Sequence, residues 1–214
     1  MTKIVALLFA AAIAPAAHAD VRITEWMYSG GSGEFIEFTN LGTSAVDFAN
    51  WSYDDDSRTP GGFDLSAFGL VGAGESVVIT EADAATFRLD WGLADTVKVL
   101  GNYTNNIGRA DEINLFDDAG SLVDRLAYGD NSIGGPRTQG VSGHAMTAGA
   151  LGANDVTGWT LSVAGDAEGS YVSLSSAIGS PGSTAFAPAV PEPETYAMLL
   201  AGLGLIGFAA RRRG

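Results

Sequence analysis

The stretch VRITEWMYSGGSGEFIEFTN, residues 21–40, decides the fold class. Two runs rich in β-branched and aromatic residues, 21–28 and 34–40, flank five Gly and Ser residues, a pattern typical of two strands joined by a flexible hairpin connection. Because side chains alternate along a strand, Ile36 and Phe38 share one face, and the other face carries Phe35, Glu37 and Thr39. We therefore expect an antiparallel pair at the start of an all-β domain.

The rest of the chain repeats this pattern, with turn signals about every ten residues, as in an all-β sandwich or barrel. Further strands are predicted at 51–53, 75–80, 96–100, 112–116, 121–128, 159–163 and 171–174. Asp117-Asp118-Ala119-Gly120 predicts a tight hairpin turn. One helix is expected over 81–89, with Thr80 as a hydroxyl cap and Glu81 and Asp83 in its first turn. The Gly-, Ser- and Ala-rich residues 129–157 predict a long surface loop.

The N-terminus has the features of a secretory signal peptide over residues 1–19. Lys3 is followed by an apolar run from Ile4 to Ile13 and by the small-x-small pattern Ala17-His18-Ala19. We expect cleavage between Ala19 and Asp20. The alternative is a short transmembrane anchor, which the small residues at the cut site and the polar residues after it disfavour.

The remaining body, residues 20–190, is strongly acidic. It holds 7 basic and 23 acidic side chains, a net charge of −16, against −14 for the whole chain. Such a charge repels phosphate backbones, so nucleic acid is a poor partner. The chain contains no cysteine, which excludes zinc–cysteine sites and cysteine nucleophiles.

The last 24 residues have three ordered parts: Pro191-Glu192-Pro193, an uncharged apolar run over 196–210, and Arg211-Arg212-Arg213. A helix over 196–210 would be about 22 Å long, against about 30 Å for a hydrocarbon core. By length alone it reads as a buried core helix. The terminal arginines instead indicate a membrane segment with its C-terminal end retained on the cytoplasmic side.

In this order of parts, the tail resembles the PEP-CTERM sorting signal of exported bacterial proteins. The resemblance implies recognition by an exosortase, a membrane protease that cuts near Pro191-Glu192-Pro193. It also implies a route in a Gram-negative-type bacterium: secretion machinery, transient anchoring in the inner membrane, then the cell surface or extracellular matrix. The alternative is a plain membrane anchor without processing.

A second resemblance covers residues 21–183. The segments that carry it, in order, are ITEWMY (23–28), GEFIEFTN (33–40), VDFANW (46–51), GAG (72–74) before VVI (77–79), DEINL (111–115), GSLVD (120–124) with Tyr128, Trp159, and SPG (180–182). They resemble a lamin-tail domain, which implies an immunoglobulin-like β-sandwich. The chain departs from the family pattern at SGHAM (142–146). The expected organisation is a domain at 20–184, a linker at 185–190 and the sorting signal at 191–214.

Few residues suggest catalysis. After signal-peptide removal His144 is the only histidine, and it is expected in the long loop, where a Ser-His-Asp triad lacks a rigid scaffold. Asp54-Asp55-Asp56 offers hard oxygen ligands, so Asp54 and Asp56 are calcium candidates, although their spacing does not fit an EF-hand. The competing interpretation is a solvated turn.

Asp124 is unusual because alternation over 121–128 places it on one face with Leu122, Leu126 and Tyr128. A carboxylate on an apolar face needs hydrogen-bond donors, so we expect it to accept backbone N–H groups of a neighbouring loop. The alternative is a ligand or catalytic role.

Together these features predict an exported, non-enzymatic surface protein without cofactor, processed by an exosortase. Its expected role is structural or adhesive, among exopolysaccharide or other surface proteins. The alternative is a calcium- or glycan-binding extracellular module.

Overall fold

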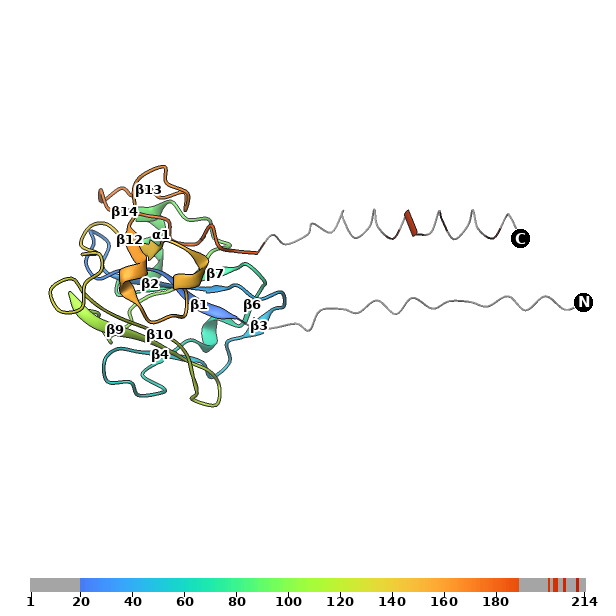
Figure 1. The fold of residues 1–214 in the computed structure, drawn as a ribbon, viewed down its shortest axis with the longest axis horizontal. Coiled ribbons are helices and arrows are strands. Elements are labelled where there is room, and N and C mark those ends of the chain that lie inside the picture. The colour runs from blue at the N-terminus through green and yellow to red at the C-terminus, as the bar shows by residue number, and fades with distance from the viewer. Residues whose placement is uncertain (1–19, 189–199, 201, 204–205, 207–210, 212–214) are drawn as a thin grey trace, which may run out of the picture.

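A computed structural model describes residues 20–188 together with residues 200, 202, 203, 206 and 211 (Figure 1). Residues 20–188 form an immunoglobulin-like β-sandwich. The first sheet has six strands in the order β12-β11-β1-β2-β7-β8, which are Trp159–Leu161, Gly143–Ala145, Val21–Met27, Phe35–Asn40, Ser76–Thr80 and Lys98–Leu100. Only β7 and β8 run parallel in it. The second sheet has the order β10-β9-β4-β5, which are Leu122–Gly129, Ala110–Phe116, Ser52–Asp54 and Phe63–Asp64.

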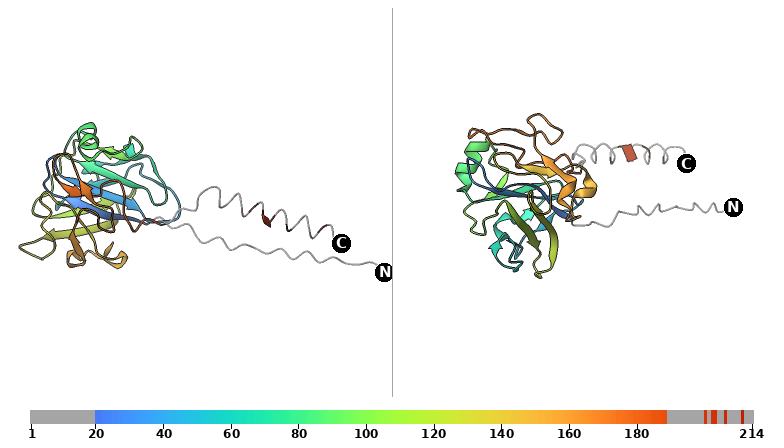
Figure 2. Two further views of the ribbon diagram at one scale, coloured as in Figure 1. Left: turned by 90° about the horizontal axis from the view of Figure 1, so that it is seen from above. Right: turned by 60° about the vertical axis from the view of Figure 1, so that its left-hand side comes forward.

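Smaller elements complete the domain. Two short pairs join β3 (Val46–Asp47) to β6 (Leu70–Val71) and β13 (Tyr171–Val172) to β14 (Ile178–Gly179). The 3₁₀ turns are Ser66–Phe68, Ala148–Ala150 and Val156–Gly158, and the helix α1 is Ala84–Trp91. In the views of Figure 2, the two ends of the domain, near residues 20 and 188, lie on the same side of the molecule.

The core lies between the two sheets. Its side chains come from the inner faces of both, and its aromatic centre is Trp26, whose ring centroid lies 5.1 Å from that of Tyr128 and 5.0 Å from that of Trp159. A second, smaller apolar cluster lies on the outer face of the six-stranded sheet beneath α1. The six-stranded sheet is therefore covered on both faces, and all six residues of β2 are buried.

The hairpin predicted at residues 21–40 is confirmed, since β1 and β2 pair with Trp26 opposite Ile36. The predicted turn at 117–120 is also present. Asp117 Oδ1 accepts the N–H groups of Ala119 at 3.0 Å and Ser121 at 2.7 Å, and Gly120 adopts φ +73°. Both features depend on residues close in sequence, which is why alternation and turn chemistry predict them.

The predicted surface loop over 129–157 is wrong in part, because β11 lies within it. This strand pairs with β1 on one side and β12 on the other. Gly143 in β11 lies against the Trp26 ring, where a Cβ atom would meet Trp26 Cζ3 at 2.9 Å. Glycine at this position allows the strand to approach the ring closely. A strand of only three residues shows no alternation in the sequence, so only its pairing with β1 and β12 makes it a strand.

The helix begins later than predicted. Asp83 is its N-cap, with Oδ1 accepting the N–H groups of Ala85 at 3.0 Å and Thr86 at 3.1 Å. Thr80 stays in β7, where its hydroxyl donates to the Glu34 carbonyl at 2.8 Å. The helix ends at Trp91, and its C-cap residue Gly92 adopts a left-handed conformation.

Several predictions fall outside the described residues: the signal peptide at 1–19, the Pro191-Glu192-Pro193 motif, most of the apolar run over 196–210, and Arg212 and Arg213. The predicted C-terminal hydrophobic helix is not confirmed. Among the residues that the structure describes, no helix is long and apolar enough to cross a bilayer.

Candidate functional site

One row of residues, opposite one another on neighbouring strands, crosses the whole six-stranded sheet. From β12 to β8 it reads Thr160, His144, Glu25, Glu37, Val78 and Val99. Residues opposite one another lie on the same face of a sheet. Val78 and Val99 belong to the outer cluster beneath α1, so the whole row is on the outer face. This face is apolar at one end and polar at the other.

Residues 162–186, here called the C-terminal strap, lie over the polar end. The strap includes β13 and β14, which Figure 1 shows with α1 on the side of the six-stranded sheet away from β4, β9 and β10. The strap contacts the sheet mainly at Glu25 and Glu37. Only 1% of the surface of Glu25 and 0% of that of Glu37 is exposed. Two fully buried acids on adjacent strands form the candidate site.

Glu25 is held by Ser142, which directly precedes β11, and by Ser180 of the strap. Its Oε1 accepts a hydrogen bond from the Ser142 hydroxyl and from the Ser180 N–H at 2.8 Å. Its Oε2 accepts from the Ser180 hydroxyl at 3.3 Å. Burial raises the pKa of Glu25 to about 7, against the lowering effect of the bonds from Ser142 and Ser180.

Glu37 is held in a similar way from the next strand. Its Oε1 accepts the hydroxyls of Thr24 at 2.5 Å and Thr39 at 3.3 Å, and its Oε2 accepts the Gly182 N–H at 2.7 Å. Burial, followed by the charge of Glu25, raises the pKa of Glu37 to about 8. Within residues 20–188 neither acid takes part in an ion pair.

Hydroxyl groups continue this layer to His144. Ser142 Oγ lies 2.7 Å from Ser162 Oγ, which lies 3.0 Å from His144 Nδ1. His144 is in β11 and only 9% exposed, so its predicted place in a loose loop is wrong. Glu25 contacts Ser142 and not the imidazole, so the acid does not orient the histidine as a Ser-His-acid triad requires.

A third buried acid, Glu168, ties down the end of the strap. Its Oε2 accepts the Thr184 hydroxyl at 2.9 Å and the Ala185 N–H at 2.7 Å. Phe186 then packs against the main core. The predicted linker at 185–190 therefore begins with residues that are still bound to the domain.

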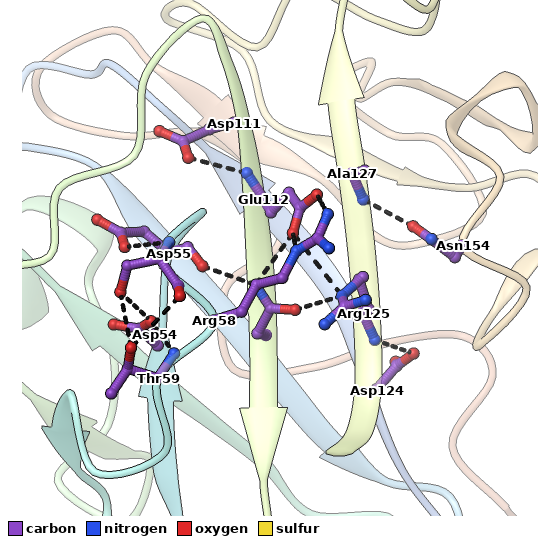
Figure 3. Close-up of polar contacts among 12 residues, drawn as sticks. Asp54, Asp55, Arg58, Thr59, Asp111, Glu112, Asp124, Arg125, Ala127 and Asn154 are labelled. Atoms are coloured by element: carbon purple, nitrogen blue, oxygen red, sulfur yellow. Dashed lines mark hydrogen bonds and ion pairs between the residues drawn. The ribbon is translucent and has the colours of Figure 1, made fainter.

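Asp124 lies between the two sheets, on the side of β1 away from the strap. Its Oδ2 accepts the Ile23 N–H at 2.9 Å, beside a β-bulge in β1. Its Oδ1 accepts the Arg125 N–H at 2.8 Å, as Figure 3 shows. The donors thus belong to strands and not to the loop we expected. Asp124, Leu126 and Tyr128 face inward as predicted, whereas Leu122 is 46% exposed, because a bulge between Leu122 and Asp124 changes the alternation. Burial raises the pKa of Asp124.

The calcium candidates separate in the structure. Asp54 ends β4 and is buried, with Oδ2 accepting from the Ser57 hydroxyl at 2.5 Å and the Thr59 N–H at 2.6 Å, and Oδ1 from Asn105 Nδ2 at 2.7 Å. Asp56 is exposed. Figure 3 shows Asp54 binding its own loop. In the described part of the chain no group of three or more acidic or histidine side chains is arranged to hold a metal. Calcium binding by Asp54 and Asp56 stays a prediction.

The same loop is fastened to the second sheet by Arg58, which forms two bonds to Glu112: Nε to Oε2 at 2.7 Å and Nη2 to Oε1 at 2.5 Å (Figure 3). Arg125 Nε lies 3.7 Å from Glu112 Oε2. The bond from Arg58 lowers the pKa of Glu112. The charge of Glu112 is therefore neutralised by Arg58, with Arg125 as a second cation nearby. Glu25 and Glu37 under the strap have no ion-pair partner within residues 20–188.

The sequence was compared with family models, curated proteins and solved structures. The model of the Lamin Tail Domain matches residues 14–130, and that of the PEP-CTERM protein-sorting motif matches residues 189–213. No curated protein and no solved structure gives a significant match. The first match reaches from β1 to β10 and covers more than half of the chain, whereas β11, β12 and the strap lie beyond it. The chain therefore belongs to the lamin tail domain family, and it carries a PEP-CTERM sorting motif at its C-terminal end.

Proposed function

We propose that this chain is a non-enzymatic surface or matrix protein with a structural or adhesive role. The sorting motif itself indicates an exported protein that an exosortase recognises, with transient membrane anchoring on the way to the cell surface. The finer role is our inference. It includes cleavage near Pro191-Glu192-Pro193, retention by Arg211-Arg212-Arg213 until then, and release into the exopolysaccharide matrix.

The observation that carries the non-enzymatic role is the use of the buried acids. Glu25 and Glu37 bind the strap, Glu168 joins two parts of the strap to each other, Asp124 binds β1, and Asp54 binds its own loop. Each carboxylate accepts backbone N–H groups of the same chain, which is how acids stabilise a fold. A catalytic acid instead needs an oxygen directed toward a substrate.

The charge of the domain supports an extracellular setting. A net charge of −16 over residues 20–190 keeps such a domain soluble and separate from other acidic molecules. It disfavours nucleic acid as a partner, and it favours neutral or cationic groups on polysaccharides and surface proteins.

The experiment replaces Pro191-Glu192-Pro193 by three alanines and follows a tagged chain through cell fractionation. We expect the variant to stay in the membrane fraction, because the apolar run over 196–210 is unchanged. Pro188→Ala, three residues before the motif, is the control and should be released like the parent. Equal release of the triple variant and the parent would contradict the proposed processing.

A further inference from the structure

We propose that Glu25 and Glu37 form a proton-dependent clasp that holds the C-terminal strap on the sheet and so sets the reach of the sorting signal. The inference rests on the proposed exosortase processing, because it concerns the segment that leads to the cleavage motif. It assigns to the buried pair a regulatory role in presenting that motif.

The clasp lies close to the sorting signal along the chain. The Ser180 N–H and the Gly182 N–H, which donate to Glu25 and Glu37, lie directly before the residues bound by Glu168. Three peptide units separate Pro188 from Pro191, so with the strap bound the motif begins at most about 11 Å from the domain. If the strap were released as far as Leu161, thirty peptide units would separate the domain from the motif, a reach of roughly 100 Å.

The buried pair needs a proton. Glu25 and Glu37 are opposite one another on adjacent strands, and both are fully buried. Two like charges in such a place cannot both be stable without a cation, so the pair retains a proton. The titratable groups near the pair are His144 on β11 and Glu168 and Tyr171 on the strap, and Asp166 lies near His144. His144 contacts Ser162 and neither acid, and the others are neutral or negative.

Binding of the strap favours the protonated form of the pair. Two influences of the strap oppose each other: its N–H groups favour the ionised acids, whereas its covering of the pair removes water and favours the protonated ones. Burial is the larger influence on both pKa values, and both are raised. Binding of the strap is therefore coupled to proton uptake, and its equilibrium shifts toward release as the pH rises through about 7 to 8.

The strap is suited to local opening. Residues 163, 171, 172 and 174 are exposed, among them Val163, Val172 and Leu174 with more than half of their surface in contact with solvent. Apart from the two-residue pair of β13 and β14, the strap's only bridge to the rest of the described domain is the isolated one between Ile178 and Val141. Segments with few ladder hydrogen bonds open at a lower free energy than the core.

The test measures hydrogen exchange of the full chain in detergent, at residues 176–186, at pH 6 and pH 8. Rates are corrected for the intrinsic pH dependence of exchange. In the parent chain, protection of these amides should fall about tenfold or more, as expected when one proton is coupled to opening over one pH unit. In Glu25→Gln with Glu37→Gln neither side chain can ionise, so protection should be equal at the two pH values within about twofold. Glu37→Gln alone keeps Glu25, so it should retain part of the parent's loss of protection.

Glu34→Gln is the matched control. Burial raises the pKa of Glu34 to about 7 as well, but its Oε1 accepts the Ile107 N–H and does not contact the strap. This variant should keep the parent's loss of protection at residues 176–186. A loss that disappears in Glu34→Gln as it does in Glu25→Gln with Glu37→Gln would mean that these amides exchange through global unfolding, and it would overturn the clasp. A parent chain without any loss between pH 6 and pH 8 would overturn it too.

A second arm links the clasp to sorting. At pH 8 the double variant Glu25→Gln with Glu37→Gln should be released from cells more slowly than the parent, because its strap stays bound. Equal release would overturn the link between clasp and sorting. Failure of the sorting proposal itself is recognised separately, since then the triple alanine variant of Pro191-Glu192-Pro193 would also be released normally, while the exchange experiment is independent of the exosortase.

Discussion

The two faces of the six-stranded sheet are both buried, but by different chemistry. The inner face packs aromatic and aliphatic side chains around Trp26, whereas the outer face places Glu25 and Glu37 under the strap. Apolar burial does not depend on pH, and buried acids make the cover over them depend on it. One sheet thus combines a permanent interface with a titratable one.

The largest effect is expected on the inner face. Trp26→Ala removes the side chain between Tyr128 and Trp159 and should cost about 3–5 kcal/mol of unfolding free energy. Leu89→Ala on the exposed side of α1 is the control, with an effect within about 0.5 kcal/mol. Denaturant unfolding measures both. A small effect of Trp26→Ala would mean that the inner face is not the main source of stability.

The outer face should respond to pH. Glu25 and Glu37 have a raised pKa in the folded domain, so between about pH 4.5 and pH 8 the folded state binds more protons than the unfolded chain. Their stabilising contribution is complete below about pH 4.5 and is lost as the pH rises, by up to about 1.4 kcal/mol per pH unit for one group.

Glu37→Gln should therefore flatten the dependence of the unfolding free energy on pH, which denaturant titrations at pH 5 and pH 8 would measure. Its stability relative to the parent should improve toward pH 8. If parent and variant lose stability in parallel, Glu37 is ionised throughout, and the contrast between the two faces disappears.

Asp124 tests a buried acid between the sheets, away from the strap. Asp124→Ala leaves the N–H groups of Ile23 and Arg125 without their acceptor and should cost about 1–3 kcal/mol. Asp118→Ala in the exposed hairpin turn should cost well under about 1 kcal/mol. Denaturant unfolding at constant slope separates the two, and equal small effects would show that Asp124 does not hold β1.

The smallest effect is expected from calcium. All of the hydrogen bonds of Asp54 go to its own loop and to Asn105, so millimolar calcium should leave the melting temperature unchanged. A rise in the melting temperature that Asp54→Ala with Asp56→Ala removes would instead establish a calcium site, because a ligand of the native state stabilises it by mass action.

The sequence-based predictions are confirmed where a feature depends on residues that are close together in the sequence. The hairpin at 21–40, the turn at 117–120 and the inward phase of Asp124, Leu126 and Tyr128 depend on alternation and on turn residues. The prediction that Leu122 faces inward is wrong, because a bulge cannot be recognised from alternation. The prediction of a loop in place of β11 is wrong, because these three residues form a strand only by pairing with β1 and β12.

The sequence by itself determined the all-β class, the order of domain and sorting motif, and the shared face of Phe35, Glu37 and Thr39. Glu37 in that alternation was the one feature of the sequence that indicated polar side chains on the outer face of the six-stranded sheet. Only the tertiary structure decided that Glu25 and Glu37 are buried. The strap residues that bind them, Ser180 and Gly182, are 155 and 145 positions away along the chain. Whether a side chain is buried depends on what covers it, and here the cover comes from the opposite end of the domain.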